Sequence, residues 1–258
     1  MPSTVLLAEL TREHVRELAP RATAVLPTAA VEQHGPHLPL ATDTFACTAV
    51  CQRAAELASA DVPVLVAPTL PYGFSHHHLP HPGVLTLSSA TFAQVVRELG
   101  DSLYRSGFRR LVIVNGHGGN DELIRIAARD LANELHMSIA AASYWTIAWR
   151  ALVTEADAGR LGQLPGHAGA FETSLVLALR PELVDRAALP PARRGGGVPD
   201  AQRLEPAVFR AGVRLGTGPG YNDDPSAATA EAGQRYLDVI ARSVAAFVVD
   251  FHRRHPEG

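Results

Sequence analysis

Four short apolar segments alternate along the chain with segments in which apolar residues recur every three or four positions. The apolar segments have the composition of strands buried on both faces, and they cover residues 23–31, 62–70, 110–116 and 137–145. Helical spacing covers residues 42–59, 89–107 and 120–136. This alternation predicts an α/β fold, a three-layer sandwich whose central sheet is mostly parallel.

The pattern becomes less regular after residue 149. A loop running into an apolar helix is predicted at residues 166–179, and a C-terminal helix is predicted after the N-cap Ser226. Residues 189–224 are rich in Pro, Gly and Arg, and we interpret them as a lid, an intersubunit arm or a flexible linker. The length of 258 residues suits one large domain, 1–258, or at most two fused lobes.

The composition argues against some classes of binding partner and indicates the cellular location. The net charge of −3 and the lack of a basic stripe argue against nucleic acid and against an anionic membrane surface. No apolar run approaches the roughly 20 residues that span a bilayer, and the N-terminal stretch does not have the pattern of a signal peptide. Cys47 and Cys51 lie one turn apart on a predicted helix, which disfavours a disulfide, so we expect a cytoplasmic protein.

Metal-binding side chains follow the predicted strands. Glu32, His34 and His37 follow the first strand, Asp43 begins the next helix, and His117 follows the third strand within NGHGGN. Because the carboxyl ends of parallel strands share one edge of a sheet, we expect these side chains to meet. Glu32 and His34 are two residues apart, so in an extended segment both point to the same side.

The types of these side chains predict the metal. Carboxylates and imidazoles without thiolates suit Zn²⁺ or Mn²⁺. The candidates outnumber the ligands that one tetrahedral zinc ion needs, so the pattern indicates two divalent ions per chain with a bridging carboxylate. For any single residue a solvated loop position is the alternative, and only the joint occurrence favours a metal centre.

A substrate pocket is predicted beside the metals, in the loops after the second and fourth strands. The second loop holds four histidines, which cannot all be metal ligands. We select Tyr72, Ser75, His78 and Trp145 as substrate-binding candidates. For Trp145, a place in the hydrophobic core is the alternative.

The stretch GHAGAFETS contains two further candidates, His167 and Glu172. A histidine near a metal-bound water can carry protons, since its unperturbed pKa is close to neutrality. Glu172 lies in the first turns of a predicted helix and is a metal ligand, a carboxylate that orients an imidazole, or a helix cap.

Five stretches of the sequence resemble the creatininase (creatinine amidohydrolase) family: EQHGPHLPLATD, PYGFSHHHLPHPGVLTLS, VNGHGGN, GHAGAFETS and DPSAATAE. The resemblance extends over nearly the whole chain, and the first and third motifs are highly specific in combination. It implies a creatininase-like three-layer fold, a two-metal site and usually a hexamer. By motif it also implies that Glu32, His34, Asp43 and His117 are metal ligands, that Asp43 is the bridge and that His167 transfers a proton.

The chain departs from the family pattern around the implied pocket. Creatininases proper carry a ligand Glu two residues after the NGH histidine, where this chain has Gly119, and the NGHGGN branch implies Glu172 as the fifth ligand. The usual Glu, Thr and Glu of the family are replaced here by Ala170, Val84 and His77. These differences argue against creatinine itself as the substrate.

The leading hypothesis is therefore a metal-dependent amidohydrolase of a small molecule. A hydroxide bridging two ions would attack a non-peptide amide, cyclic amides included, and His167 would pass a proton to the leaving nitrogen. One alternative is a peptidase or deformylase that matures a natural product or cofactor. The other is a catalytically inert family member that binds metal or ligand.

Overall fold

The computed structural model describes residues 4–190 and 219–256 and is built on a four-stranded sheet. Its strands are β1 (Thr23–Thr28), β2 (Val64–Val66), β3 (Arg110–Asn115) and β4 (Ser138–Ser143), and their order in the sheet is β2-β1-β3-β4. All three strand pairings are parallel, so every strand ends at the same edge. The predicted α/β fold is confirmed.

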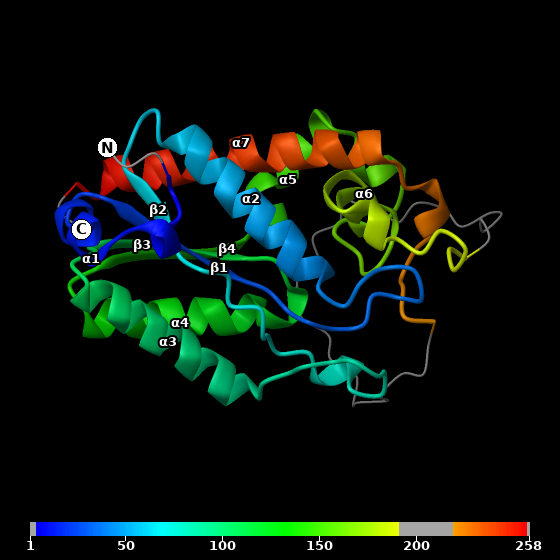
Figure 1. The fold of residues 1–258 in the computed structure, drawn as a ribbon, viewed down its shortest axis with the longest axis horizontal. Helices are drawn as coiled ribbons and strands as arrows, with labels where there is room; N and C mark the ends of the chain where they lie inside the picture. Colours follow the sequence, from blue (N-terminus) through cyan, green and yellow to red (C-terminus); the bar gives the residue numbers. More distant parts are fainter. Residues whose placement is uncertain (1–3, 191–218, 257–258) are drawn as a thin grey trace.

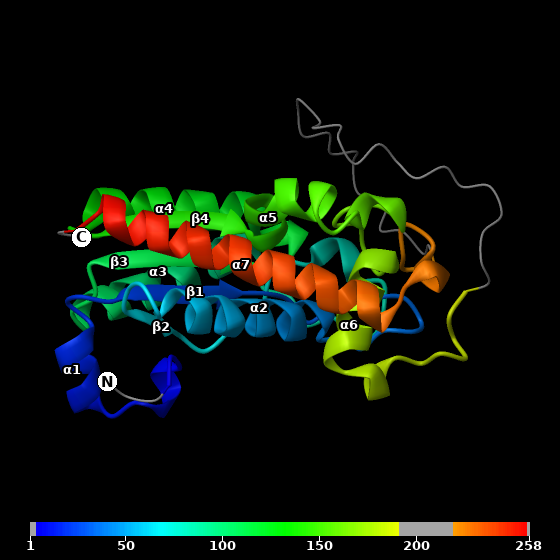
Figure 2. The same cartoon turned by 90° about the horizontal axis from the view of Figure 1, so that it is seen from above.

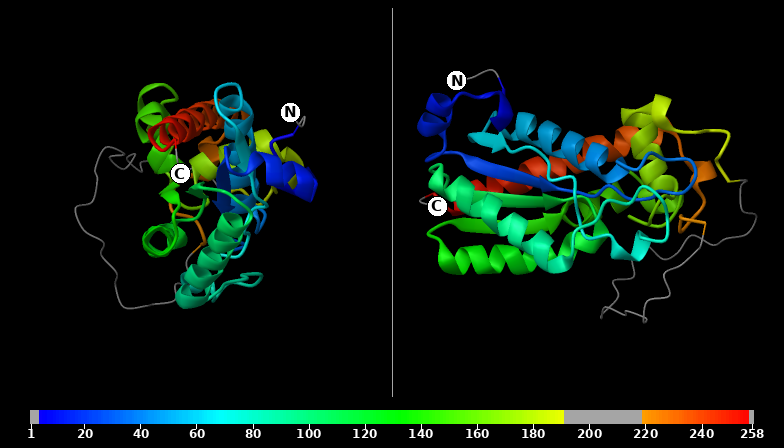
Figure 3. Two further views of the ribbon diagram at one scale, coloured as in Figure 1. Left: turned by 90° about the vertical axis from the view of Figure 1, so that its left-hand side faces the viewer. Right: turned by 60° about the horizontal axis from the view of Figure 1, so that its bottom comes forward.

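Helices cover both faces of this sheet (Figure 1). On one face lie α2 (Thr42–Ala58), α5 (Tyr144–Thr154) and α7 (Ala230–Arg254), and on the other lie α3 (Ser89–Arg105) and α4 (Asp121–Glu134). The short α1 (Arg12–Leu18) packs with the second group. Viewed end-on, the two helical layers lie on opposite sides of the sheet, as a three-layer sandwich requires (Figure 3).

The sixth helix, α6 (Ala170–Leu179), lies beyond the carboxyl ends of the strands, against the first half of α7 (Figures 1 and 2). The two helices approach closely at Gly233, where an added Cβ would come within 1.8 Å of the carbonyl oxygen of Ser174. Glycine permits this contact because it has no side chain. The fold thereby places one helix directly over the edge where the strands end.

The alternation of side chains along each strand produces two cores. In β3, Val112 and Val114 pack with α2, α5 and α7, whereas Leu111 and Ile113 pack with α3 and α4. On α2 the buried residues are small and recur every three or four positions, which lets the helix lie close to the sheet. They include both cysteines, which are free and buried, as the sequence predicts.

Some predicted boundaries are wrong. The predicted strand over residues 62–70 contains only β2, because prolines at 63 and 68 flank it and lack the amide hydrogen that a sheet ladder needs. The fourth strand ends at Ser143, and Tyr144 and Trp145 begin α5 instead.

The predicted cap of the last helix is also wrong. Ser226 belongs to the short 3₁₀ turn Pro225–Ala227, and the side chain of Asp224 accepts its N–H. The N-cap of α7 is Thr229, whose hydroxyl accepts the N–H of Ala232. Residues 191–218, most of the segment interpreted as a lid, arm or linker, lie outside the described residues. Within the described part of the chain, no helix is long and apolar enough to cross a bilayer.

Candidate metal centre

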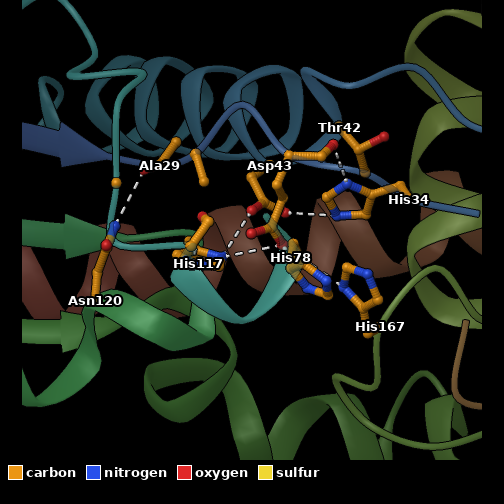
Figure 4. A network of polar contacts seen from close by, with 12 residues as sticks. Ala29, His34, Thr42, Asp43, His78, His117, Asn120 and His167 are labelled. Atoms are coloured by element: carbon orange, nitrogen blue, oxygen red, sulfur yellow. Dashed lines mark hydrogen bonds and ion pairs between the residues drawn. The ribbon is translucent and has the colours of Figure 1, made fainter. Parts of the chain in front are cut away.

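The loops that follow the strands meet at one edge of the sheet, as predicted. Glu32 and His34 follow β1, Asp43 lies in the first turn of α2, His117 follows β3, and Glu172 lies in the first turn of α6. All five side chains are buried, with exposures of 0 to 8%. Figure 4 shows His34, Asp43 and His117 side by side at the centre of this cluster. Residues that are up to 140 positions apart therefore share one site.

One nitrogen of His34 is held by the backbone and the other faces carboxylates. Nδ1 lies 3.2 Å from the carbonyl oxygen of Glu32, to which it can only donate. Nε2 lies 3.1 Å from Oδ1 of Asp43 and 3.7 Å from Oε2 of Glu172. If Nδ1 carries the proton, the lone pair of Nε2 points at two acid groups, an arrangement that needs a proton or a metal ion between them.

His117 repeats this arrangement on the other side of Asp43. Its Nε2 donates to the carbonyl oxygen of Phe74 at 3.0 Å, and the hydroxyl of Ser75 lies 3.2 Å away. Its Nδ1 lies 3.3 Å from Oε1 of Glu32 and 3.0 Å from Oδ2 of Asp43. Asp43 thus turns one carboxylate oxygen to each histidine.

The carboxylates concentrate negative charge in a buried place. Burial disfavours a charge on His34, but the neighbouring Asp43 and Glu172 carboxylates outweigh it and raise the pKa of His34 to about 10. Burial raises the pKa of Glu172 to about 8, because the charged form loses its hydration. Oε2 of Glu32 is buried and has no hydrogen-bond partner among the described residues. The cluster therefore attracts positive charge.

Three groups of side chains offer ligand atoms within 4.8 Å of one another: His34 with Asp43 and Glu172; Glu32 with His77 and His117; and Glu32 with His34 and His167. The first group includes Asp43, and the second lies next to it, because His117 Nδ1 is 3.0 Å from Oδ2 of Asp43. The second adds His77, which the sequence analysis names as the replacement of a family Glu but not as a candidate ligand.

Two asparagines that the sequence analysis did not select hold the loops together. Asn120 donates to the carbonyl oxygen of Ala29 at 3.1 Å and accepts the N–H of Phe74 at 2.9 Å, so its amide links the loops after β1 and β2 (Figure 4). Asn115 donates to the carbonyl oxygen of His117 at 2.6 Å. Asn120 occupies the N-cap position of α4, but its side chain does not cap the helix.

His167 and His78 form a second layer beside Glu32. Their rings stack at 4.4 Å, and both contact the amide of Gln33. Nδ1 of His167 and Nε2 of His78 lie 3.7 and 3.6 Å from Oε1 of Glu32. Burial lowers the pKa of His167 to about 3 and that of His78 to about 4. Gln33, only 6% exposed, carries no charge and matches no metal-ligand pattern, so the sequence did not reveal it.

The other predicted pocket residues are placed differently. Ser75 is fully buried against His117, so it contacts a predicted ligand rather than open space. Trp145 is partly buried and packs against the core and, edge to face, against Tyr144. Tyr72 is 45% exposed, and no hydrogen bond in the described part of the chain joins it to the cluster.

His37, part of the first motif, lies apart from the metal centre. Its Nε2 lies 2.9 Å from the hydroxyl of Thr173 on α6, and it belongs to none of the three ligand groups found in the described residues.

Residues 219–224 contact the loop that carries His167. The N–H of Asn222 donates to the carbonyl oxygen of His167 at 2.9 Å. The carboxylate of Asp223 accepts the N–H groups of Gln163 and of Ala170, the first residue of α6. The loop is therefore held on both sides of His167.

Known proteins are similar to this chain in sequence. The sequence profile of the creatininase family, described as creatinine amidohydrolase, matches residues 8–248. The chain is 34% identical over 260 residues to the creatinine amidohydrolase of Pseudomonas putida, covering 95% of this chain and 96% of the relative. It is also 35% identical over 220 residues to the mycofactocin precursor peptide peptidase of Mycobacterium ulcerans (strain Agy99), covering 82% and 78%.

Solved structures agree. A manganese form of creatininase superposes with a TM-score of 0.76 at 30% identity, covering 96% of this chain and 98% of the other. A mutant creatininase of zinc–zinc type superposes with a TM-score of 0.78 at 30% identity, with the same coverage. The parallel sheet covered by helices, the buried cluster and these relatives place the chain among the metal-binding hydrolases. The chain belongs to the creatininase family.

Proposed function

We propose that this creatininase-family hydrolase uses two divalent metal ions to cleave an amide C–N bond of a small, non-peptide substrate, cyclic amides included. The observation that supports this proposal most directly is the position of Asp43. Its two carboxylate oxygens lie 3.1 Å from His34 and 3.0 Å from His117. A carboxylate between two imidazoles is suited to bridge two ions.

The residues present fit two ions. Backbone carbonyls hold the outer nitrogens of both histidines, which is the usual support for a metal-binding imidazole. The unpaired buried oxygen of Glu32 is an acceptor that a cation would satisfy. The donors are carboxylate and imidazole only, which suits Zn²⁺ and Mn²⁺, the metals of the related creatininase structures.

The geometry supports one assignment of ligands. Glu32 and His117 would hold one ion, His34 and Glu172 would hold the other, and Asp43 would contribute to both. Gly119 has no side chain to offer, and Glu172, the fifth ligand that the resemblance implies, lies 3.7 Å from His34 Nε2. The N–H of Ala168 donates to Oε2 of Glu172 at 2.5 Å and orients this carboxylate.

When bound, the two ions would acidify a water molecule and polarise the amide carbonyl. The chain contributes the rest. His167 is the proposed catalytic residue because its ring stacks on His78 and reaches the Glu32 side of the cluster. Burial of these rings keeps bulk water away and strengthens each electrostatic contact. Proton transfer by His167 stays a prediction, as do substrate binding by His78, Ser75, Tyr72 and Trp145.

The test is metal removal and replacement. Protein dialysed against a chelator is expected to lose all turnover of creatinine, lactams and formamides, and to regain it on addition of Zn²⁺ or Mn²⁺. The absence of metal-dependent turnover of every amide in the panel would contradict the proposal. The variant His167→Ala is expected to bind metal and to be inactive, which would also exclude an inert family member.

A peptidase is the second candidate, because the relative from Mycobacterium ulcerans is named as a peptide peptidase. A panel of short peptides with free and modified C-termini distinguishes the two. Faster turnover of a peptide than of any small amide would favour this alternative, and genes beside this one would indicate the peptide.

Assembly and location stay predictions. The homo-oligomer, a hexamer by resemblance, is checked by light scattering of the purified protein, and a cytoplasmic location by fractionation of cells that express it. No nucleic-acid or membrane partner is expected at the net charge of −3.

A further inference from the structure

Gln33 joins the two histidines that face the metal centre. The residue lies between the proposed ligands Glu32 and His34 and is 6% exposed. Its side-chain nitrogen lies 2.8 Å from Nε2 of His167 and 3.0 Å from Nδ1 of His78. One amide group therefore contacts one nitrogen of each ring.

The backbone determines which way this amide points. Its oxygen accepts the N–H of Gly35 at 2.9 Å. In the reverse orientation the NH₂ group would face that N–H, two donors would oppose each other, and the N–H of Gly35 would lose its acceptor. The NH₂ group of Gln33 must therefore face the two rings.

The protonation of the rings follows from this orientation. An amide NH₂ group only donates, so the ring nitrogens that it contacts must be unprotonated. A neutral imidazole carries its single proton on the other nitrogen, which is Nδ1 in His167 and Nε2 in His78. These two nitrogens are the ones that lie 3.7 and 3.6 Å from Oε1 of Glu32.

The two N–H groups are directed to one region, and neither makes a hydrogen bond to the Glu32 oxygen that lies there. Because both nitrogens lie within 3.7 Å of the same oxygen atom, they converge beside the cluster. Both distances exceed the range of a hydrogen bond, so the groups remain available to another acceptor. The stacked rings, 4.4 Å apart and tilted by 20°, keep them together.

We propose that Gln33 is a positioning residue that fixes the tautomers of His78 and His167, so that both present an N–H to the carbonyl oxygen of the substrate. The inference rests on the proposed function. Two converging neutral donors suit an oxygen on which negative charge develops, and they disfavour a substrate that places a further N–H donor there.

This inference changes the role predicted for His167. A proton carrier needs a nitrogen with an available lone pair, and in His167 that nitrogen is occupied by Gln33. His167 then acts as a hydrogen-bond donor to the substrate oxygen instead of a base.

The experiment is ¹⁵N NMR of histidine-labelled, zinc-loaded full-length protein, with signals assigned from single histidine variants. In the parent, Nδ1 of His78 and Nε2 of His167 are expected to have the shift of an unprotonated nitrogen. Gln33→Glu turns the donor into an acceptor and is expected to move the proton to both of these nitrogens. Gln33→Met keeps the length of the side chain, removes both hydrogen bonds and is expected to abolish the preference.

Kinetics of the same variants separate positioning from a structural role. Gln33→Met is expected to retain its metal and to lower kcat on the order of 10- to 100-fold with little change in KM, since misdirected donors fail mainly in the transition state. The control is Gln94→Glu, which makes the same exchange as Gln33→Glu but at an exposed site on α3. It is expected to leave the histidine signals and kcat unchanged.

The outcomes are distinct. A parent protein with the proton on Nε2 of His167, or a Gln33→Met variant with parental kcat, overturns the inference. A parent that has the expected tautomers but hydrolyses no amide contradicts the proposed function and leaves the tautomer assignment standing.

Discussion

The two halves of the proposed metal centre are held in different ways. The strand half, Glu32 and His117, lies in loops that directly follow β1 and β3. The helix half is His34 and Glu172, and Glu172 is provided by α6, beyond the edge of the sheet (Figure 2). Asp43 is shared by both halves.

The hydrogen bonds that hold the two halves in place also come from different parts of the fold. The strand half is fixed by the amide of Asn120, which links backbone groups of the first and second loops. The helix half depends on residues 219–224, where Asp223 holds the start of α6. The difference teaches that one of the two proposed ion sites is built on the sheet itself, whereas the other depends on the packing of a later segment against it.

The largest effect is expected at the shared residue. Asp43→Asn preserves volume and removes the charge, so both ions should bind weakly and turnover should fall by about three or more powers of ten, because metal ions supply several kcal/mol of transition-state stabilisation. Metal content and kcat of the purified variant check this, with exposed Asp61→Asn as the control. A variant that keeps both ions would show that Asp43 is no bridge.

Removing one half at a time should remove one ion at a time. Glu172→Gln is expected to lower the metal-to-protein ratio from two to one and to leave the strand half loaded, whereas Glu32→Gln should empty the strand half. Metal analysis after gel filtration measures the ratio, and Glu56→Gln, at an exposed position of α2, is the control. A ratio of two in the Glu172→Gln variant would assign the fifth ligand elsewhere.

The support of the strand half is tested at Asn120. Asn120→Ala leaves the carbonyl of Ala29 and the N–H of Phe74 without this partner, at a cost of about 1–3 kcal/mol of unfolding free energy for each buried group. Denaturant unfolding measures the loss, and Asn133→Ala at an exposed site of α4 should be nearly neutral. An equally small effect at both sites would argue against the network as the support.

The smallest effect is expected at Asp223. Asp223→Ala removes the acceptor for Gln163 and Ala170, and such supporting contacts typically change metal affinity about 10- to 100-fold. The loss should fall on the helix half alone, as measured by competition with a chelator. Asp185→Ala, which also removes a carboxylate from backbone N–H groups, is the control. Equal weakening of both ions would show that the halves are not supported separately.

The sequence predicts that Glu32 and His117 lie close together, and the structure places them so. Glu32 and His117 follow buried strands, and parallel strands must end at the same edge. The periodicity of apolar residues also predicts where the helices lie, as α2 and α4 show. The cap of α7 was missed because both Ser226 and Thr229 suit a cap, and only packing against α6 decides between them.

The supporting contacts could not be predicted in the same way. Asn120 reads as a helix cap, and Gln33 as an ordinary polar residue of a loop. Their partners lie in loops brought together by the fold, so no spacing along the chain marks them. Asp223 is likewise paired with residues more than 50 positions away.

The most direct test of the central claim is electron paramagnetic resonance of the protein loaded with two equivalents of Mn²⁺. If Asp43 bridges the ions, the spectrum is expected to be that of two magnetically coupled Mn²⁺ ions, and Asp43→Asn should abolish it. A spectrum of isolated Mn²⁺ in the fully loaded parent would contradict the account.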